Sequence, residues 1–506
     1  MLNSVAKLLE RNAEKSGCRV ALADEFGETT WQEYRDAAIK IADYLIKEVT
    51  KGGFKKPVGI LIDRNRLSII AFLGCACSGN FYIPLDASMP AERLDLILKE
   101  LQPVCLLDAR GTDTVYDGAV DVRTILKEWQ ANEEAVKNAV CMTIDTDPLY
   151  AIFTSGSTGI PKGVLVSHRS VLDLTEAFAE AFQFDETSVF GNQAPYDFDV
   201  SVKDIYNALY CAGRVEVIPK RMFVRPNLLI PYLAERGINT LIWAVSAVRI
   251  VADFDTFHEV KTEKPLMLRY VMFSGEVMPV KALNYWMDFL PDAIFVNLYG
   301  PTEITCNCTY FLVDKRYDVD QVLPVGKPFS NTRVLLLDES NRNIDEPHVT
   351  GEICVEGTGV ALGYWNNPEK TRECFTRTPG TTEYDSRMYR TGDLGYYDAD
   401  GNICFASRKD HQIKHMGHRI ELGEIETVIN SLTFIDVCCC LYDADKEKIV
   451  CFYQAEQENK KAIVSELLKR LPKYMWPGKY VCMEKLPLNR HGKIDRQELA
   501  GRLKDI

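Results

Sequence analysis

Short apolar runs alternate with helix-type segments along the first 300 residues. From about residue 57 the chain reads VGILID, a helical LSIIAFLGCACSG, FYIPLD, a segment AERLDLILKEL that follows Pro90, and VCLLD. The same alternation returns between about 200 and 300, where glycines follow two of the helical segments. Apolar strands separated by helices are typical of βαβ units. The sequence therefore predicts an α/β body built on doubly wound parallel sheets.

The pattern changes in the last 200 residues. After about residue 320, Gly- and Asp-rich segments between apolar runs predict hairpins and hence an antiparallel β subdomain packed on the body. Past about 408, a short helix, two strands, a helix and a further strand predict a small α+β domain. We expect two domains, residues 1–408 and residues 409–506.

Size, charge and cysteine usage exclude several classes of protein. A chain of 506 residues exceeds what one hydrophobic core supports. Its net charge of -13 and its lack of a long basic run disfavour nucleic acid and anionic lipid as partners. No long apolar stretch predicts membrane insertion, so we expect a cytoplasmic protein. The 16 cysteines lack paired CxxC spacing, and we expect neither a structural metal nor a disulfide framework.

A loop of small residues, TSGSTGIPKG, directly follows the short apolar run YAIF. Backbone N–H groups and hydroxyls of such a loop, together with a lysine, can surround phosphate oxygens. The loop is not a Walker A motif, because its lysine precedes glycine rather than following one. The candidate phosphate ligands are Thr154, Ser155, Gly156, Ser157, Thr158, Gly159 and Lys162.

Further segments in a fixed order carry a family resemblance. They are TWQEYRDAA (30–38), FDVSVKDI (198–205), NLYGPTEIT (297–305), GEICVEGTGVALGYWN (351–366), YRTGDLG (389–395), RKDHQIKHMGHRIELGEIE (408–426) and NRHGKID (489–495). With these, nearly the whole chain resembles the adenylate-forming enzymes. Within them it resembles the amino-acid adenylation domains of nonribosomal peptide synthetases and, around FDVSVKDI, the D-alanine:carrier-protein ligases.

The resemblance implies roles in ATP binding and catalysis. Tyr299 would stack on adenine, Asn297 would bond its amine, and Asp393 would accept the ribose hydroxyls with Arg408 nearby. Glu303 would hold Mg²⁺, a hard cation that prefers oxygen ligands. Further ATP-binding positions are Gly300 and Thr302, and the catalytic set is Lys493, Lys162 and Glu303.

The resemblance also implies a two-step reaction. The substrate carboxylate attacks the α-phosphorus of ATP, pyrophosphate leaves, and the acyl group then passes to the phosphopantetheine thiol of a separate carrier protein. The family's small C-terminal domain is mobile and rotates about a hinge, here Asp410, which brings the loop at Gly417 to the site. The motif before this hinge departs from the family pattern, because Ser407 stands where glycine is usual. A monomer is the expected state.

Asp199 matches the family's ligand for the α-ammonium group, which indicates an amino-acid substrate. The other expected pocket positions are Val200, Lys203, Trp243, Met272, Ser274, Leu298, Cys306 and Asn307. Trp243 and Met272 would make the pocket tight and favour a small side chain such as that of D-alanine. Lys203 would be costly if buried unpaired, and it leaves an acidic amino acid as the second candidate. Ser274 stands where the D-alanine ligases carry cysteine, which puts D-alanine itself in question.

Two other functions compete with amino-acid activation. An acyl- or aryl-CoA ligase of the same superfamily would have no ammonium group to bind at Asp199. A non-catalytic nucleotide-binding homologue would be indicated by loss of Glu303, Asp393 or Lys493, and all three are present.

Lys493→Ala should abolish adenylate formation and leave ATP binding nearly intact, because its charge is needed where negative charge develops during the reaction. Pyrophosphate exchange and ATP titration measure the two effects separately. Exchange at the full rate in this variant would remove Lys493 from its role.

Overall fold

The computed structural model describes residues 2–156, 161–319, 321–381, 383–409, 412–488 and 494–505, and the chain divides into two compact units. The first unit is Met1–Asp86, Gln102–Ile152 and Val164–Lys409, and the second is Ala87–Leu101, Phe153–Gly163 and Asp410–Ile506. The second unit thus includes two short segments from the first third of the chain. The domain boundary between residues 408 and 409 stays a prediction.

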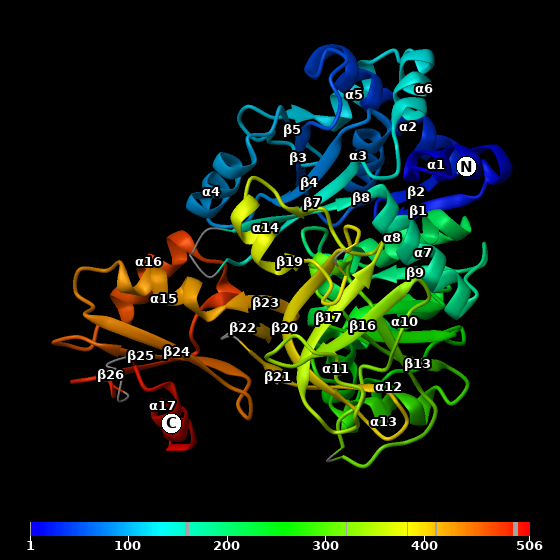
Figure 1. Cartoon of the computed structure of the whole chain (residues 1–506). Coiled ribbons are helices and arrows are strands. Elements are labelled where there is room, and N and C mark those ends of the chain that lie inside the picture. The colour runs from blue at the N-terminus through cyan, green and yellow to red at the C-terminus, as the bar shows by residue number, and fades with distance from the viewer. Residues whose placement is uncertain are drawn as a thin grey trace. The chain divides into compact units, whose positions relative to one another are not determined.

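The largest sheet of the first unit runs in the order β15-β14-β13-β12-β11-β9-β10-β1-β2 (Figure 1). Its strands from β13 to β1 pair in parallel, and β2, β14 and β15 are antiparallel additions at the two edges. The bounds are Val20–Asp24 (β1), Gly27–Thr30 (β2), Val189–Asn192 (β9), Arg214–Val217 (β10), Thr240–Ala244 (β11), Tyr270–Ser274 (β12), Ile294–Tyr299 (β13), Thr309–Val313 (β14) and Lys327–Pro328 (β15).

Two further sheets complete this unit. One has the order β18-β8-β7-β4-β3-β5-β6, and the other contains β16, β17, β20, β19 and β21 with antiparallel pairing throughout. The bounds are Pro57–Ile62 (β3), Phe81–Asp86 (β4), Cys105–Asp108 (β5), Val120–Asp121 (β6), Pro148–Thr154 (β7), Lys162–Ser167 (β8), Thr332–Leu337 (β16), Gly351–Gly357 (β17), Gly363–Tyr364 (β18), Phe375–Thr376 (β19), Met388–Tyr397 (β20) and Ile403–Arg408 (β21).

Helices cover both faces of the largest sheet. One apolar core combines side chains of α1, α2, α3, α7 and α8 with one face, and a second core joins α10, α11 and α13 to the other face. The helices of this unit are Val5–Ser16 (α1), Trp31–Tyr44 (α2), Arg66–Cys77 (α3), Val122–Glu128 (α5), Glu133–Met142 (α6), His168–Phe182 (α7), Val200–Cys211 (α8), Lys220–Val224 (α9), Pro226–Glu235 (α10), Val245–Asp253 (α11), Thr256–Glu259 (α12), Val280–Phe289 (α13) and Pro368–Cys374 (α14). The predicted fold class, parallel sheets with an antiparallel subdomain, is confirmed.

Local sequence explains how several of these helices begin. Thr30 and Glu33 form a reciprocal capping box at the start of α2, and Ser167 accepts a backbone N–H of α7. Helix α8 is different, because its N-cap residue, Asp199, makes no capping hydrogen bond within the described helix. The Asp199 carboxylate still benefits from the positive end of the helix dipole.

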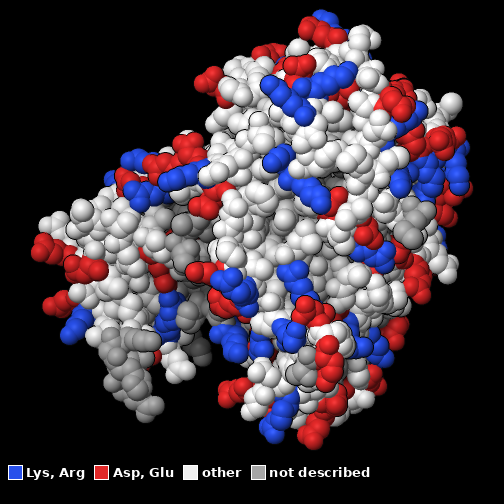
Figure 2. Space-filling view, turned by 45° about the horizontal axis from the view of Figure 1, so that its top comes forward, with Lys and Arg blue, Asp and Glu red and all other residues white. Residues whose placement is uncertain are grey.

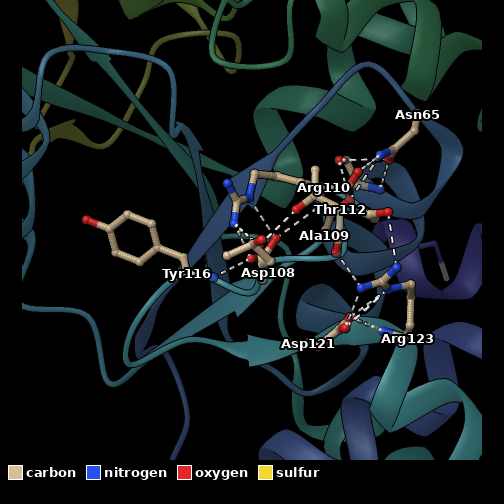
Figure 3. Close-up of polar contacts among 11 residues, drawn as sticks. Asn65, Asp108, Ala109, Arg110, Thr112, Tyr116, Asp121 and Arg123 are labelled. Atoms are coloured by element: carbon tan, nitrogen blue, oxygen red, sulfur yellow. Dashed lines mark hydrogen bonds and ion pairs between the residues drawn. The ribbon is translucent and has the colours of Figure 1, made fainter.

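A polar network holds the loop between β5 and β6 (Figure 3). Asp108 accepts hydrogen bonds from the guanidinium of Arg110, and Asp121 accepts them from Arg123, which points toward the same loop. Asn65, the N-cap of α3, donates to the carbonyl oxygens of Ala109 and Arg110. These contacts fix a loop at the carboxyl ends of the parallel strands.

The second unit has its own core. It contains Gln412–His415 (β22), His418–Glu421 (β23), Val437–Asp443 (β24), Lys448–Gln454 (β25), Lys479–Met483 (β26), Ala91–Leu101 (α4), Leu422–Asn430 (α15), Lys460–Arg470 (α16) and Arg496–Gly501 (α17). Cys438 and Cys440 pack with α15 and α16 on one face of β24, and Cys439 packs with Val450 on the other. The cysteines of this run therefore pack as small apolar residues of a strand.

Lysine and arginine side chains lie among aspartate and glutamate side chains on the face in view in Figure 2. No helix in the described ranges combines the length and the apolar character needed to cross a membrane.

Candidate functional site

The parallel strands of the largest sheet end at one edge, and the candidate residues gather there. Strands β11, β12 and β13 end at Ala244, Ser274 and Tyr299. Their ends lie side by side, because Ala244 pairs with Ser274 and Ser274 pairs with Leu298. Helix α8 packs against one face of this sheet. Ligands of open α/β sheets bind outside the carboxyl ends of the strands, so this edge is the expected location of a site.

Lys203 on α8 meets Ser274 at this edge. The Lys203 Nζ atom donates a hydrogen bond of 3.0 Å to Ser274 Oγ, and the lysine is fully buried at 0% exposure. Met272 and Leu298 belong to the same apolar core as α8, and Val200 is buried at the first residue of that helix. The structure therefore brings these predicted pocket residues to one face of the sheet.

Trp243 lies on the opposite face. Its indole N–H donates to the Gly191 carbonyl oxygen at 2.7 Å, its ring packs edge-on against Phe223, and it belongs to the second apolar core. The residues of β11 that share a face with Met272 and Ser274 are Ile242 and Ala244, by the strand register. Alternation along the strand was the signal that could have identified them from the sequence.

A tight turn after β13 carries Cys306 and Asn307. Thr305 and Cys306 both have left-handed backbone conformations, with φ of 58° and 79°. A Cβ on Gly300 would lie 2.7 Å from the Cys306 carbonyl oxygen, so this position requires glycine. Cys306 lies beside Lys203 and Asp199, and burial raises the pKa of its thiol. Asn307 instead lines a small cavity together with Phe329 and Val360.

Two tyrosines near the predicted residues were not identified from the sequence. Tyr150 on β7 is fully buried, and its hydroxyl has no hydrogen-bond partner among the described residues. Burial, and then neighbours that include Asp199 and Cys306, raise the pKa of Tyr150 well above its usual value. Tyr364 donates a hydrogen bond of 2.7 Å to the carboxylate of Glu303. Both residues lie in segments quoted in the sequence analysis, YAIF and GEICVEGTGVALGYWN. Only their tertiary contacts show that they lie near the candidate site residues.

Asp393 is the centre of a second polar group. The Tyr299 hydroxyl donates to Asp393 Oδ2 at 2.6 Å, and the Arg408 guanidinium donates to Asp393 Oδ1. Asp393 and Arg408 face each other across β20 and β21, and the Asp393 N–H donates to Thr391 Oγ1 at 3.0 Å. Burial and the adjacent Asp393 carboxylate raise the pKa of Tyr299 well above its usual value. The predicted adenine and ribose ligands therefore lie in contact.

Asn297 and Glu303 lie on either side of Tyr299 in the sequence. The Asn297 amide nitrogen donates to Pro324 O at 2.8 Å, which fixes the orientation of the carboxamide. Glu303 lies in the short 3-10 turn Thr302–Ile304 and is fully buried. No group of three or more His, Cys, Asp or Glu side chains in the described ranges is arranged to hold a metal. One carboxylate is sufficient for Mg²⁺ that is bound mainly by phosphate oxygens and water, and Glu303 fits this role.

The phosphate loop is described in part. Thr154 ends β7 with a buried hydroxyl that has no partner in the described part of the chain, and Lys162 begins β8. Ser155 Oγ donates to Arg419 O at 2.9 Å and accepts the Glu421 N–H at 3.2 Å. In this structure the Ser155 hydroxyl therefore contacts strand β23.

Several predicted residues fall elsewhere. Gly417 occupies the turn between β22 and β23 with φ of 80°, next to Met416, which is also left-handed. The hairpin that carries Gly417 is thus the one whose second strand contacts Ser155. Gly156 ends a described range, and Ser157, Thr158, Gly159, Asp410 and Lys493 lie outside the described residues.

Comparison with protein families and curated proteins gives consistent matches. A family model described as AMP-binding enzyme matches residues 9–365, and one described as AMP-binding enzyme C-terminal domain matches residues 424–493. The chain is 32% identical over 509 residues to a D-alanine--D-alanyl carrier protein ligase of Bacillus cytotoxicus, covering 97% of this chain and 98% of that protein. It is also 30% identical over 505 residues to tyrocidine synthase 1 of Brevibacillus parabrevis, covering 98% of this chain and 45% of that protein. The chain therefore spans less than half the length of several curated relatives that it matches.

A solved structure agrees with these matches. A nonribosomal peptide synthetase protein with adenylation and PCP domains, bound to a vinylsulfonamide inhibitor, has a TM-score of 0.85 and 28% identity. The similarity covers 99% of this chain and 84% of that one.

Asp204, next to Lys203, should make the stability of the unliganded protein depend on pH. Burial raises its pKa from 3.8 to about 7, with the Asn192 amide and Lys203 acting in the opposite direction. Because the folded-state pKa lies above the unfolded-state value, this group stabilises the fold at low pH, and the contribution is lost as pH rises through about 7.

Asp204→Asn should therefore stabilise the protein more at about pH 8 than at about pH 5, by an amount on the order of a few kcal/mol. Urea unfolding at both pH values measures the difference. The matched variant at an exposed carboxylate, Asp318→Asn, should lack this pH dependence. Equal effects of Asp204→Asn at the two pH values would contradict the assignment.

Proposed function

This chain belongs to the AMP-binding enzyme family, and we propose that it is a ligase that activates an amino acid with ATP. The product is an aminoacyl-adenylate, and its acyl group passes to the phosphopantetheine thiol of a separate carrier protein. The observation that carries the proposal is Asp199. Its carboxylate lies at the N-terminus of α8, is nearly buried at 6% exposure, and lies near the pocket residues Lys203 and Cys306. A buried carboxylate at the pocket is a suitable partner for a substrate ammonium group.

The first step joins carboxylate oxygen to phosphorus. One oxygen of the amino acid attacks the α-phosphorus of ATP, the bond to the β-phosphate oxygen breaks, and pyrophosphate leaves with the electron pair. No general base is required, because the attacking carboxylate is already ionised. Negative charge on the phosphoryl oxygens is stabilised by Lys162, Lys493 and the backbone N–H groups of the phosphate loop.

The Asp393 group supports the nucleotide half of the proposal. Tyr299 offers an aromatic ring beside the Asp393 carboxylate, which accepts hydrogen bonds from Tyr299 and Arg408. When a nucleotide binds, its ribose hydroxyls would donate to this carboxylate in place of Tyr299 and Arg408. Glu303 would hold Mg²⁺, which neutralises triphosphate charge when bound. Tyr364 fixes one Glu303 oxygen, and this contact orients the carboxylate.

The second step transfers the acyl group. The carrier-protein thiol attacks the carbonyl carbon of the mixed anhydride, the thiol proton is released to solvent, and AMP leaves. Full-length similarity to a D-alanyl carrier protein ligase supports this acceptor. Because ATP is a cytoplasmic substrate, we place the enzyme in the cytoplasm, and we expect it to act as a monomer with a domain boundary near residue 408.

Pyrophosphate exchange with ATP and Mg²⁺, across both enantiomers of the common amino acids and a few aryl and short fatty acids, tests the first step. We expect exchange that depends on an amino acid, followed by thioester formation on a phosphopantetheine carrier protein. Exchange only with acids that lack an amino group, and transfer to free coenzyme A, would favour the CoA ligase. Nucleotide binding without exchange for any acid would indicate a non-catalytic homologue.

Asp199→Asn tests the ammonium site with little change in shape. Loss of a charge-assisted hydrogen bond should raise the KM for the amino acid by about 10- to 150-fold, with the KM for ATP nearly unchanged. Exposed Asp318→Asn is the matched control and should leave both constants unchanged. An unaltered amino-acid KM in Asp199→Asn would refute the role of Asp199.

A further inference from the structure

Lys203 is a buried amine with no ion-pair partner in the described parts of the chain. It is fully enclosed, and its Nζ donates a hydrogen bond to Ser274 Oγ at 3.0 Å. An ammonium group can donate three hydrogen bonds. Removing a charge from water without pairing it costs several kcal/mol, so a buried amine of this kind is a strong indication of a ligand.

The uncharged side chains around Lys203 do not supply the missing charge. Burial raises the pKa of the Cys306 thiol and of the Tyr150 hydroxyl, so both are neutral at physiological pH. Ser274 is neutral as well. Ser274 and Cys306, which lie beside Lys203, can therefore bond to an anion but do not carry a negative charge.

The two carboxylates nearest in sequence are committed elsewhere. Asp204 accepts a hydrogen bond of 2.9 Å from the Asn192 amide and forms no ion pair with Lys203. Asp199 lies one helical turn before Lys203, and by the proposed function it binds the substrate ammonium. Once that ammonium is bound, Lys203 still lacks a carboxylate within ion-pair distance among the described residues, and Asp204 acts on it through electrostatics alone.

Unsatisfied polar atoms nearby point in the same direction. Among the described residues, the buried Tyr150 hydroxyl has no partner, and neither has either amide atom of Asn207, which lies one turn beyond Lys203 on α8. Buried polar groups in native proteins nearly always have partners. Tyr150 lies beside Asp199 and Cys306, and Asn207 follows Lys203 on α8, so these atoms favour a polar subsite over an apolar one.

We propose that Lys203 binds the side-chain carboxylate of the substrate, and that the enzyme activates an acidic α-amino acid of the aspartate or glutamate type. This inference rests on the proposed function, since it assumes that Asp199 holds the α-ammonium. Asp199 and Lys203 are four residues apart on one helix, about 6 Å along its axis. An amino acid with a carboxylate one or two methylenes from Cα can contact both, and its two charges balance theirs.

A small side chain such as that of D-alanine fits this arrangement less well. Its methyl group would bring no hydrogen-bond acceptor to Lys203. With Trp243 on the other face of the sheet, the pocket also loses one of the two large residues that favoured a small substrate.

Pyrophosphate exchange with both enantiomers of aspartate and glutamate, compared with asparagine, glutamine, alanine and glycine, tests the inference. The wild-type enzyme should prefer one acidic amino acid over its amide by about 10- to 150-fold in kcat/KM. Preference for alanine or glycine over both acids would overturn the inference but leave the proposed function intact. Absence of exchange with every amino acid would overturn the proposed function and this inference with it.

Lys203→Met keeps the length of the side chain and removes its charge. It should lower kcat/KM for the acidic substrate by the same factor and leave asparagine, glutamine and alanine unchanged or improved. Exposed Lys261→Met is the matched control and should preserve the acidic preference. An acidic preference that persists in Lys203→Met would overturn the role of Lys203.

Thermal unfolding with and without ligand gives a readout that does not depend on catalysis. Exposed Lys261→Met should unfold at the same temperature as the wild type. Aspartate or glutamate should raise the unfolding temperature of the wild type but not of Lys203→Met. An equal rise in unfolding temperature for the wild type and Lys203→Met on addition of aspartate or glutamate would overturn the inference.

Discussion

The desolvation of charged side chains on α8 is the constraint on which the site depends. The helix is almost wholly buried, and it carries Asp199, Lys203 and Asp204 into the interior of the first unit. Each of these groups needs a compensating contact, because burying an isolated charge is costly. Asn192 supplies one for Asp204, and Ser274 supplies part of one for Lys203. The neighbouring strands must therefore present polar side chains at defined positions, as Ser274 at the end of β12 does for Lys203.

Strand β13 connects the two halves of the site. Leu298 shares the face of Met272 and Ser274, whereas the next residue, Tyr299, reaches Asp393 through its hydroxyl. Successive side chains of a strand point to opposite faces, so adjacent residues can contact different ligands. Gly300 then allows the chain to turn closely against Cys306. A few residues of one strand and the turn after it would therefore hold the proposed amino-acid pocket and the proposed nucleotide contacts in a fixed relation.

The sequence was sufficient for the order of strands and helices because apolar runs and glycine stops report local structure directly. It did not predict correctly which face of the sheet each side chain occupies. Trp243 was placed in the pocket by motif position, yet a shift of one residue along a strand moves a side chain to the other face, and Ile242 and Ala244 occupy the pocket face instead. Tyr150 and the contact of Ser155 with β23 depend on segments distant in sequence, which no local pattern reports.

A polar pocket and an apolar pocket discriminate between substrates by different amounts. A tight apolar pocket separates two side chains that differ by one methylene only weakly, whereas a pocket with buried polar groups strongly rejects a substrate that leaves those groups unpaired. The proposed role of Lys203 would put this protein in the second class. Under that proposal, the free energy that buried Lys203 lacks in the empty pocket would be recovered when a matching substrate binds. The cost of burying Lys203 and the selectivity for an acidic substrate would then have the same physical origin.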